Sequence, residues 1–149
     1  VDNSVLDKMN KPPVQVYESF VKKYSKINKT LKKQQYLIPY LISGHPGSDL
    51  KAAIKMAEYL RDVKFTPQQV QDFYPTPGTV STCMFHTGLD PFTMKRVYVP
   101  KSRKEKAMQR ALLQYNRRRN YNLVYEALNK AGRQDLIGNG RKCLIREKN

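Results

Sequence analysis

Apolar residues recur along this chain with helical spacing in some stretches and form unbroken runs in others. In residues 13–33 an apolar residue returns every three or four positions, which predicts an amphipathic helix with one buried stripe. The stripe consists of Tyr17, Phe20, Val21, Tyr24, Ile27 and Leu31. Lysines fill the rest of this segment, as is usual for a solvated helix face. A shorter helix is expected over residues 3–10, and Pro12 and Pro13 end it because proline cannot extend a helix.

Residues 36–43 form a continuous apolar run, which predicts a strand covered on both faces of a parallel sheet. Pro39 counts against this strand because it removes a hydrogen-bond donor from the middle of the run, unless a bulge accommodates it. The run ends in the turn Gly44-His45-Pro46-Gly47, where Ser48 is expected to cap the next helix. That helix has a buried stripe made of Leu50, Ala53, Ile54, Ala57 and Leu60.

A second strand is predicted over residues 69–74, and Pro75 and Pro77 end it. The single helix between the two strands suits a right-handed crossover within one parallel sheet. Both strand ends then lie at the same edge, where the turns present backbone N–H groups to a ligand. The sequence therefore predicts part of an active site at this edge.

The remainder of the chain is expected to be mainly helical. Residues 75–100 show no sustained period, and only Tyr98 and Val99 suggest a short extended segment. Ser102 and Glu105 form a capping box, which opens a helix reaching Tyr115. A further helix follows Asn120 and ends at Gly132, with Tyr121, Val124, Tyr125 and Leu128 expected to face inward.

The net charge of +16 is concentrated in the last third of the chain. Residues 101–149 hold fourteen basic and four acidic residues, a net charge of +10, against +4 in residues 1–50 and +2 in residues 51–100. A basic segment of this kind favours contact with RNA or another polyanion. A solubilising surface, partly compensated by acidic parts of a longer protein, explains the charge equally well.

The length of 149 residues predicts one domain with a hydrophobic core, and no run is long enough to span a membrane. Cys83 and Cys143 are too few for a disulfide framework, a structural zinc site or an iron–sulfur cluster. Few cysteines suit a reducing cytoplasm, where we expect the protein to reside. The chain opens with Val1 rather than Met, which is consistent with a piece of a longer protein.

Candidate ligand-binding residues gather at the two strand ends. The pattern Ile42-x-Gly44-x-x-Gly47 permits close approach of a ligand to the backbone, although a plain strand-to-helix turn has the same pattern. His45 could exchange a proton near neutral pH, or it could be an ordinary turn residue. Asp72 could accept a hydrogen bond from a ligand or from its own turn. Cys83 and His86 have a metal-ligand spacing, but no second ligand pair follows them, so a metal site is not expected.

Taken together, several segments resemble the YgiQ-type branch of the radical SAM enzymes, along essentially the whole chain. The matching segments are residues 5–12, Tyr36 to Ser48, Gln71 to Pro77, Asp90-Pro91 with Val97 to Pro100, Gln109 to Tyr115, Asp135 to Gly138 and Cys143 to Ile145. This resemblance implies an α/β fold: the last two βα units of a partial (β/α)6 TIM-like barrel, followed by a mainly helical C-terminal extension. The barrel portion is then residues 1–99 and the basic helical extension is residues 100–149.

The resemblance also implies a cofactor. Enzymes of this family use a [4Fe–4S] cluster to cleave S-adenosylmethionine reductively to a 5′-deoxyadenosyl radical. Their fifth strand carries G-x-I-x-G-x-x-G against the adenine, and here Ile42, Gly44 and Gly47 match while Tyr40 replaces the first glycine. The cofactor-binding residues implied in this way are Ile42, Gly44, His45, Pro46, Gly47, Asp72 and Tyr74.

The cysteine motif that holds the cluster is absent from this sequence. The resemblance therefore implies that the chain needs the missing N-terminal part of its own polypeptide and is not active alone, with substrate and reaction unspecified. A different hypothesis is a basic RNA-binding module without catalytic activity, acting through residues 101–149. The two can coexist, because related radical SAM enzymes modify RNA bases.

Overall fold

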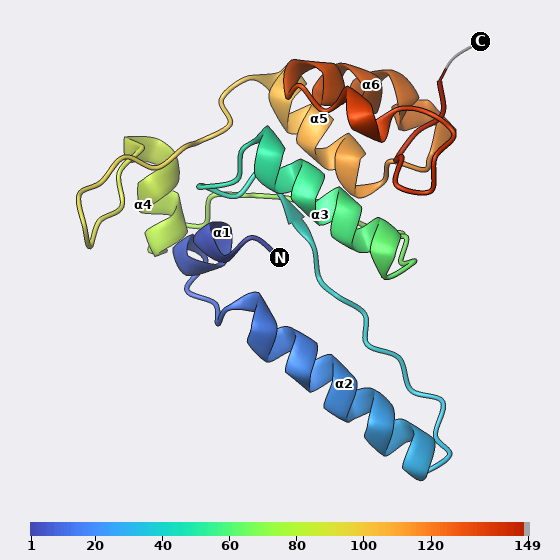
Figure 1. Ribbon diagram of the computed structural model, residues 1–149. Coiled ribbons are helices and arrows are strands. Elements are labelled where there is room, and N and C mark those ends of the chain that lie inside the picture. Colours follow the sequence, from blue (N-terminus) through green and yellow to red (C-terminus); the bar gives the residue numbers. More distant parts are fainter. Residues whose placement is uncertain (148–149) are drawn as a thin grey trace.

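Two short parallel strands and six α-helices make up residues 1–147, the part of the chain that the computed structural model describes (Figure 1). In chain order the elements are α1 (Asn3–Lys8), α2 (Val14–Thr30), β1 (Ile42–Ser43), α3 (Leu50–Asp62), β2 (Gln71–Asp72), α4 (Val80–Thr87), α5 (Arg103–Leu113), α6 (Tyr121–Lys130), and the 3₁₀ turns Arg118–Asn120 and Gln134–Leu136.

Strands β1 and β2 pair in parallel, with Ile42 opposite Gln71 and Ser43 opposite Asp72. Helix α3 connects them, so the predicted pairing of two parallel strands through one helix is confirmed. Each strand is only two residues long, however, and the prediction of a strand from residue 36 is wrong. Pro39 lacks an N–H, and the only backbone bond from residues 36–41 to a strand within residues 1–147 runs from the Gln71 N–H to the Leu41 carbonyl, so residues 36–40 form no ladder.

The principal hydrophobic core lies where α3, α5 and α6 pack together (Figure 1). Ile54, Leu112 and Leu128 are completely buried there, one from each helix. The predicted stripe of α3 is confirmed, since Ala53, Ile54, Ala57 and Leu60 are all buried. The core draws on residues from both sides of position 100, which joins the helical C-terminal segment firmly to α3.

Capping residues set the ends of these helices. Ser102 accepts a hydrogen bond from the Glu105 N–H at the start of α5, as predicted. At the start of α3, Asp49 rather than the predicted Ser48 is the cap, because the Asp49 carboxylate accepts from the Ala52 N–H. Gly132 follows α6 in a left-handed conformation with φ of 67°, which its lack of a Cβ permits.

Two sequence expectations about the later helices are wrong. Residues 80–87 form helix α4, capped by Thr79 and ended by Gly88, although no period indicated a helix there. Only Met84 of α4 is buried, so the element is too short and too exposed to give an apolar stripe. On α6, Val124 and Leu128 face inward as expected, but Tyr125 is 44% exposed and lies against the ring of Tyr121.

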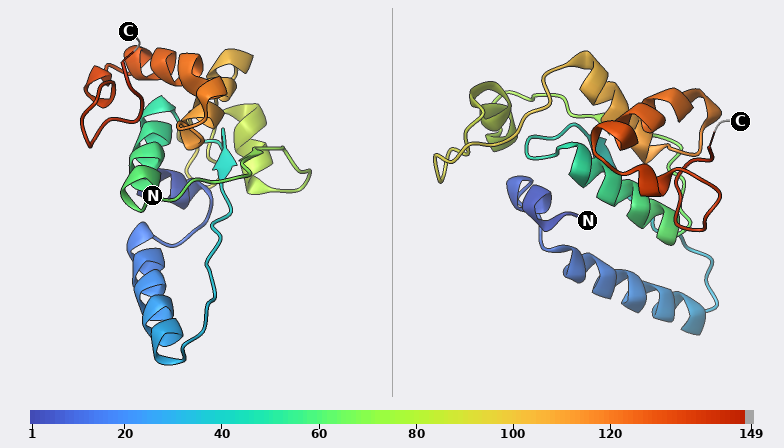
Figure 2. Two further views of the ribbon diagram at one scale, coloured as in Figure 1. Left: turned by 90° about the vertical axis from the view of Figure 1, so that its right-hand side faces the viewer. Right: turned by 45° about the horizontal axis from the view of Figure 1, so that its top comes forward.

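Helix α2 is confirmed as a helix but stands apart from the core. No residue of α2 is buried, and the two views of Figure 2 show it as a separate arm joined to the sheet by the extended segment 31–41. The predicted apolar stripe of α2 therefore faces an open surface within the described part of the chain.

Candidate functional site

The loop between β1 and α3 owes its shape to two glycines. Gly44 and Gly47 have φ values of 71° and 91°, a region that residues with a Cβ rarely adopt. The Gly47 N–H donates to the Tyr98 carbonyl at 2.7 Å, which joins the loop to the segment before α5. A Cβ on Gly47 would lie 3.1 Å from the Lys8 Cγ, so this glycine also makes room for α1. The turn predicted from the glycine spacing is therefore present and is closely packed.

His45 lies inside this loop and is only 5% exposed. Its Nδ1 lies 2.8 Å from the Pro46 carbonyl oxygen, and its Nε2 lies 2.9 Å from the Ser81 hydroxyl on α4. A carbonyl can only accept, so the geometry assigns the proton to Nδ1, and the Ser81 hydroxyl donates to Nε2 of the neutral ring. The edge of the ring contacts Phe73 at a centroid distance of 5.0 Å.

Burial keeps the His45 ring neutral. Desolvation lowers the pKa of His45 below its ordinary value, and the hydrogen bond to the Pro46 carbonyl opposes this shift only in part. Both ring nitrogens are engaged within the protein. His45 therefore joins the β1–α3 loop to α4, and binding a ligand directly would require it to release Ser81.

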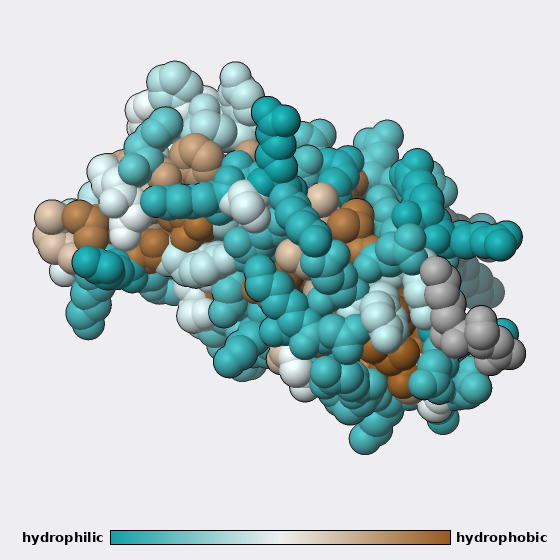
Figure 3. Space-filling view, turned by 90° about the horizontal axis from the view of Figure 1, so that it is seen from above, coloured by the Kyte–Doolittle hydropathy of each residue, from teal (hydrophilic) through white to brown (hydrophobic). Residues whose placement is uncertain are grey.

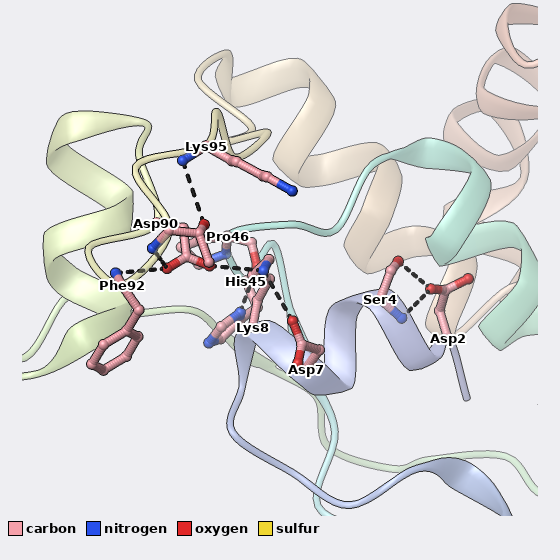
Figure 4. Close-up of polar contacts among 10 residues, drawn as sticks. Asp2, Ser4, Asp7, Lys8, His45, Pro46, Asp90, Phe92 and Lys95 are labelled. Carbon is pink, nitrogen blue, oxygen red and sulfur yellow. Dashed lines mark hydrogen bonds and ion pairs between the residues drawn. The ribbon is translucent and has the colours of Figure 1, made fainter.

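Helix α1 is anchored beside the same loop by an ion pair that the sequence did not indicate. The Lys8 ammonium lies 2.8 Å from the Asp90 carboxylate and 2.9 Å from that of Asp7 (Figure 4). Asp90 also accepts from the N–H groups of Phe92 and Thr93. These bonds lower the pKa of Asp90 to about 2, and the bond from Lys8 has the largest effect. The Asp90-Pro91 turn was the available sequence signal, but nothing in the sequence pointed to Lys8 as its partner.

A cavity of about 130 Å³ opens at the end of β1, between α1, α3 and α5. Ile42, Ser43 and His45 line it from the strand and loop, together with apolar side chains of α1 and α3. The Ser43 hydroxyl is buried and has no hydrogen-bond partner among the described residues. Gln109 of α5 also lines the cavity and donates from its amide nitrogen to the Ser48 carbonyl at 2.8 Å. The cavity thus offers an apolar wall with one unused polar group.

The two candidates from β2 and its end lie elsewhere. The Asp72 carboxylate is exposed and accepts from the Arg110 guanidinium at 2.6 Å. Tyr74 is exposed, and neither residue lines the cavity at Ser43. The predicted set therefore divides into a gathered group, residues 42–47, and two side chains on the surface, whose role in binding stays a prediction. Ser43, Ser81 and Gln109 were missed because a serine or glutamine within a helix or strand carries no distinctive spacing.

No group of three or more His, Cys, Asp and Glu side chains within residues 1–147 is arranged to hold a metal ion. Cys83 is exposed on α4, and Cys143 makes a long contact of 3.8 Å with the Asp135 carbonyl. The residues present therefore do not fit a [4Fe–4S] cluster, which needs several thiolates at one place. Among the same residues, no helix has the length and apolar character needed to cross a membrane.

Comparison with known proteins places the chain within much longer relatives. The family model "Domain of unknown function (DUF3362)" matches residues 68–148, which include α4, α5 and α6. A UPF0313 protein of Clostridium perfringens (strain 13) is 61% identical over 149 residues, all of this chain but 22% of the relative. A UPF0313 protein of Clostridium botulinum (strain Okra) is 60% identical over 145 residues, 97% of this chain and 23% of the relative. The chain thus spans less than a quarter of the length of these curated relatives, and no solved structure matches it.

Proposed function

Because the chain belongs to the DUF3362 family, a domain of unknown function, we propose that it is one part of a longer radical SAM protein of the UPF0313 kind. In this proposal the β1–α3 loop supplies part of the pocket for S-adenosylmethionine. The cluster ligands come from elsewhere in the longer polypeptide, since residues 1–147 do not offer them. When bound with its cluster, the cofactor supplies a 5′-deoxyadenosyl radical.

The cavity at the end of β1 is the observation that carries this proposal. Its apolar wall includes Ile42, which suits the face of an aromatic heterocycle, and the unpaired Ser43 hydroxyl can bond to a polar edge. An unpaired buried hydroxyl costs stability, so a ligand that bonds to it gains free energy from the pairing. Gly44 allows the adjoining backbone to turn at once toward α3.

The remaining residues of the predicted set have indirect roles in this arrangement. His45 and Pro46 hold the loop in place through the bonds to the Pro46 carbonyl and to Ser81. Gly47 gives α1 room to close one side of the cavity. A hydroxyl or amine of a ligand that reached Asp72 would compete with Arg110, and Tyr74 is free to turn toward a bound molecule because it is on the surface.

The chemistry is tested on the full-length polypeptide, purified without oxygen. We expect iron and sulfide in the amounts of a [4Fe–4S] cluster, and dithionite-dependent formation of 5′-deoxyadenosine from S-adenosylmethionine. A full-length polypeptide without iron and sulfide would overturn the radical SAM assignment. In that case the β1–α3 loop would be scaffold.

The role of the loop is tested with two matched glycine variants of the same polypeptide. Gly44→Ala and Gly78→Ala both place a Cβ on a residue with φ between 71° and 79°, so the strain is similar. Gly44 adjoins Ser43, whereas Gly78 lies in an exposed turn with no atom within 4 Å of the added Cβ. We expect Gly44→Ala to weaken cofactor binding by about tenfold, or about 1.4 kcal/mol, and Gly78→Ala to leave it unchanged. Equal affinities would exclude the loop from the pocket.

RNA binding through residues 101–149 is a second candidate, favoured by the surface over α5 and α6. Figure 3 views the molecule from that side, and hydrophilic residues dominate the face. Arg118 and Arg119, in the turn before α6, are exposed, and the partly exposed ring of Tyr125 stacks on that of Tyr121 with the ring centroids 6.2 Å apart. Basic groups beside an accessible aromatic ring are typical of single-stranded RNA sites.

This candidate predicts binding to single-stranded RNA that weakens steeply as salt increases from 50 to 200 mM, as expected when bound counterions are released (roughly tenfold or more for a few phosphate contacts). The Arg118→Glu/Arg119→Glu variant should lose binding. The matched control, Lys22→Glu/Lys23→Glu on α2, changes the net charge equally and should retain most of it. Equal losses would show attraction by net charge alone, and not a site on this face.

A further inference from the structure

We propose that the apolar face formed by α2, residues 36–41 and the end of α3 is a docking surface for an extended apolar segment of the same longer polypeptide, outside residues 1–149. We call it the arm surface. This proposal rests on the length of the relatives and on the exposed face, and it does not depend on the radical SAM assignment.

Residues 36–41 carry the first part of the argument because they alternate like a strand without being one. Exposed Tyr36, Ile38 and Tyr40 are 80%, 84% and 72% accessible, and the partly buried Leu37, Pro39 and Leu41 lie between them. Alternate side chains of an extended segment point to opposite faces, so both faces here are apolar. A strand with two apolar faces is typical of the interior of a sheet and is a liability at a free edge.

Within residues 1–147, the edge of β1 that faces away from β2 is open, so an extended segment could pair there as an added strand. Strand β1 pairs only with β2 among the described residues, so its other edge has no neighbour there. A sheet of two short strands is barely stable alone, and an added strand along β1 and residues 36–41 would supply the missing ladder. Pro39 interrupts that ladder at one position only.

A groove beside this segment supplies the second part of the argument. It has a volume of about 670 Å³ and lies between α2, residues 37–41 and the last turns of α3. Tyr17 and Phe20 line it from α2, Met56 lines it from α3, and Val63 lines it from the position directly after α3. Phe20 is 52% exposed, and α2 has no buried residue to hold it against the rest of the chain. A single amphipathic helix is marginally stable in water, so its apolar stripe requires a partner.

The identity of that partner follows from length and charge. The relatives contain more than three times as much polypeptide outside the matching part as within it, since the match covers 22% of their length. A second copy is a poorer occupant, because basic side chains surround this surface. Lysines border the arm surface at Lys11, Lys29, Lys32 and Lys33, so two copies meeting there would bring like charges together.

The test uses a photo-crosslinking amino acid, p-benzoylphenylalanine, placed in the full-length polypeptide at Phe20 and, separately, at Ile38. The control position is the partly exposed Tyr125 of α6, and that helix lies on the far side of the core from α2 (Figure 1). After irradiation, the size of the product is read from a denaturing gel, and the linked peptides are identified by mass spectrometry.

We expect products of monomer size in which both arm positions link to peptides outside residues 1–149, with much lower yield from Tyr125. Products of dimer size would show that a second copy covers the surface, and the proposal would be overturned. Links confined to residues 1–149, or yields no higher than at Tyr125, would equally overturn it, because the surface would then be open or closed by its own chain.

Discussion

Two amphipathic helices of this protein, α2 and α5, have similar sequence patterns but differ in burial: α5 packs into the core and α2 does not. Each has an apolar stripe at helical spacing, and both are helices in the structure. Helix α5 packs against α3 and α6 and buries Met108, Ala111 and Leu112, whereas α2 buries nothing within the described chain. An apolar stripe thus indicates that a helix packs against another apolar surface. It does not indicate whether that surface belongs to the same segment of polypeptide.

The largest expected difference between the two helices is in the free energy of unfolding. Leu112→Ala removes a completely buried side chain from the core and should cost about 2–5 kcal/mol. Phe20→Ala on α2 removes a half-exposed ring and should cost less than about 1 kcal/mol in the 149-residue chain. Urea unfolding of both variants measures this, and equal losses would contradict the contrast between core and arm. In the full-length polypeptide, the arm proposal predicts a larger loss for Phe20→Ala than in the shorter chain.

A buried hydrogen bond should give the next largest difference. Gln109→Leu leaves the Ser48 carbonyl without the donor that it has at 2.8 Å, and this should destabilise the chain by about 1–3 kcal/mol. Gln35→Leu, in the exposed segment after α2, is the matched control and should change the free energy of unfolding by less than about 0.5 kcal/mol. Urea unfolding of both variants measures this difference. An unchanged midpoint for Gln109→Leu would show that the bond makes no net contribution to the free energy of unfolding.

The smallest expected effect is a pH dependence of the free energy of unfolding, which arises from His45 in the β1–α3 loop. Burial lowers the pKa of His45 in the folded chain, so below about pH 6.5 the unfolded chain binds the proton more readily. The stability that neutral His45 contributes is therefore present above pH 6.5 and is lost as the pH falls from there toward the folded-state pKa. Asp90 titrates separately, because its pKa is about 2.

Unfolding measured between pH 7.5 and 5 should show this loss in the parent chain and a flatter profile in His45→Gln. His86→Gln, which replaces the exposed histidine of α4, should keep the parent profile. Identical profiles for the parent and His45→Gln would mean that burial does not hold the His45 ring neutral.

The sequence by itself determined the local elements and the turn at the candidate site. Helical spacing gave α2, α3, α5 and α6, the capping box gave Ser102, and the glycines gave the loop after β1. These features depend on residues within a few positions of each other, so spacing and capping chemistry suffice to predict them. The parallel pairing of the two strand ends was also predictable, because a single helix joins them.

Only the tertiary structure decided what each apolar or polar group meets. It engaged both nitrogens of His45, left the Ser43 hydroxyl without a partner among residues 1–147, and placed Asp72 against Arg110. It also left residues 36–41 and α2 uncovered, although their pattern predicted burial. Contacts between distant residues depend on which surfaces the rest of the chain brings together, and a pattern of neighbours along the sequence does not contain that information.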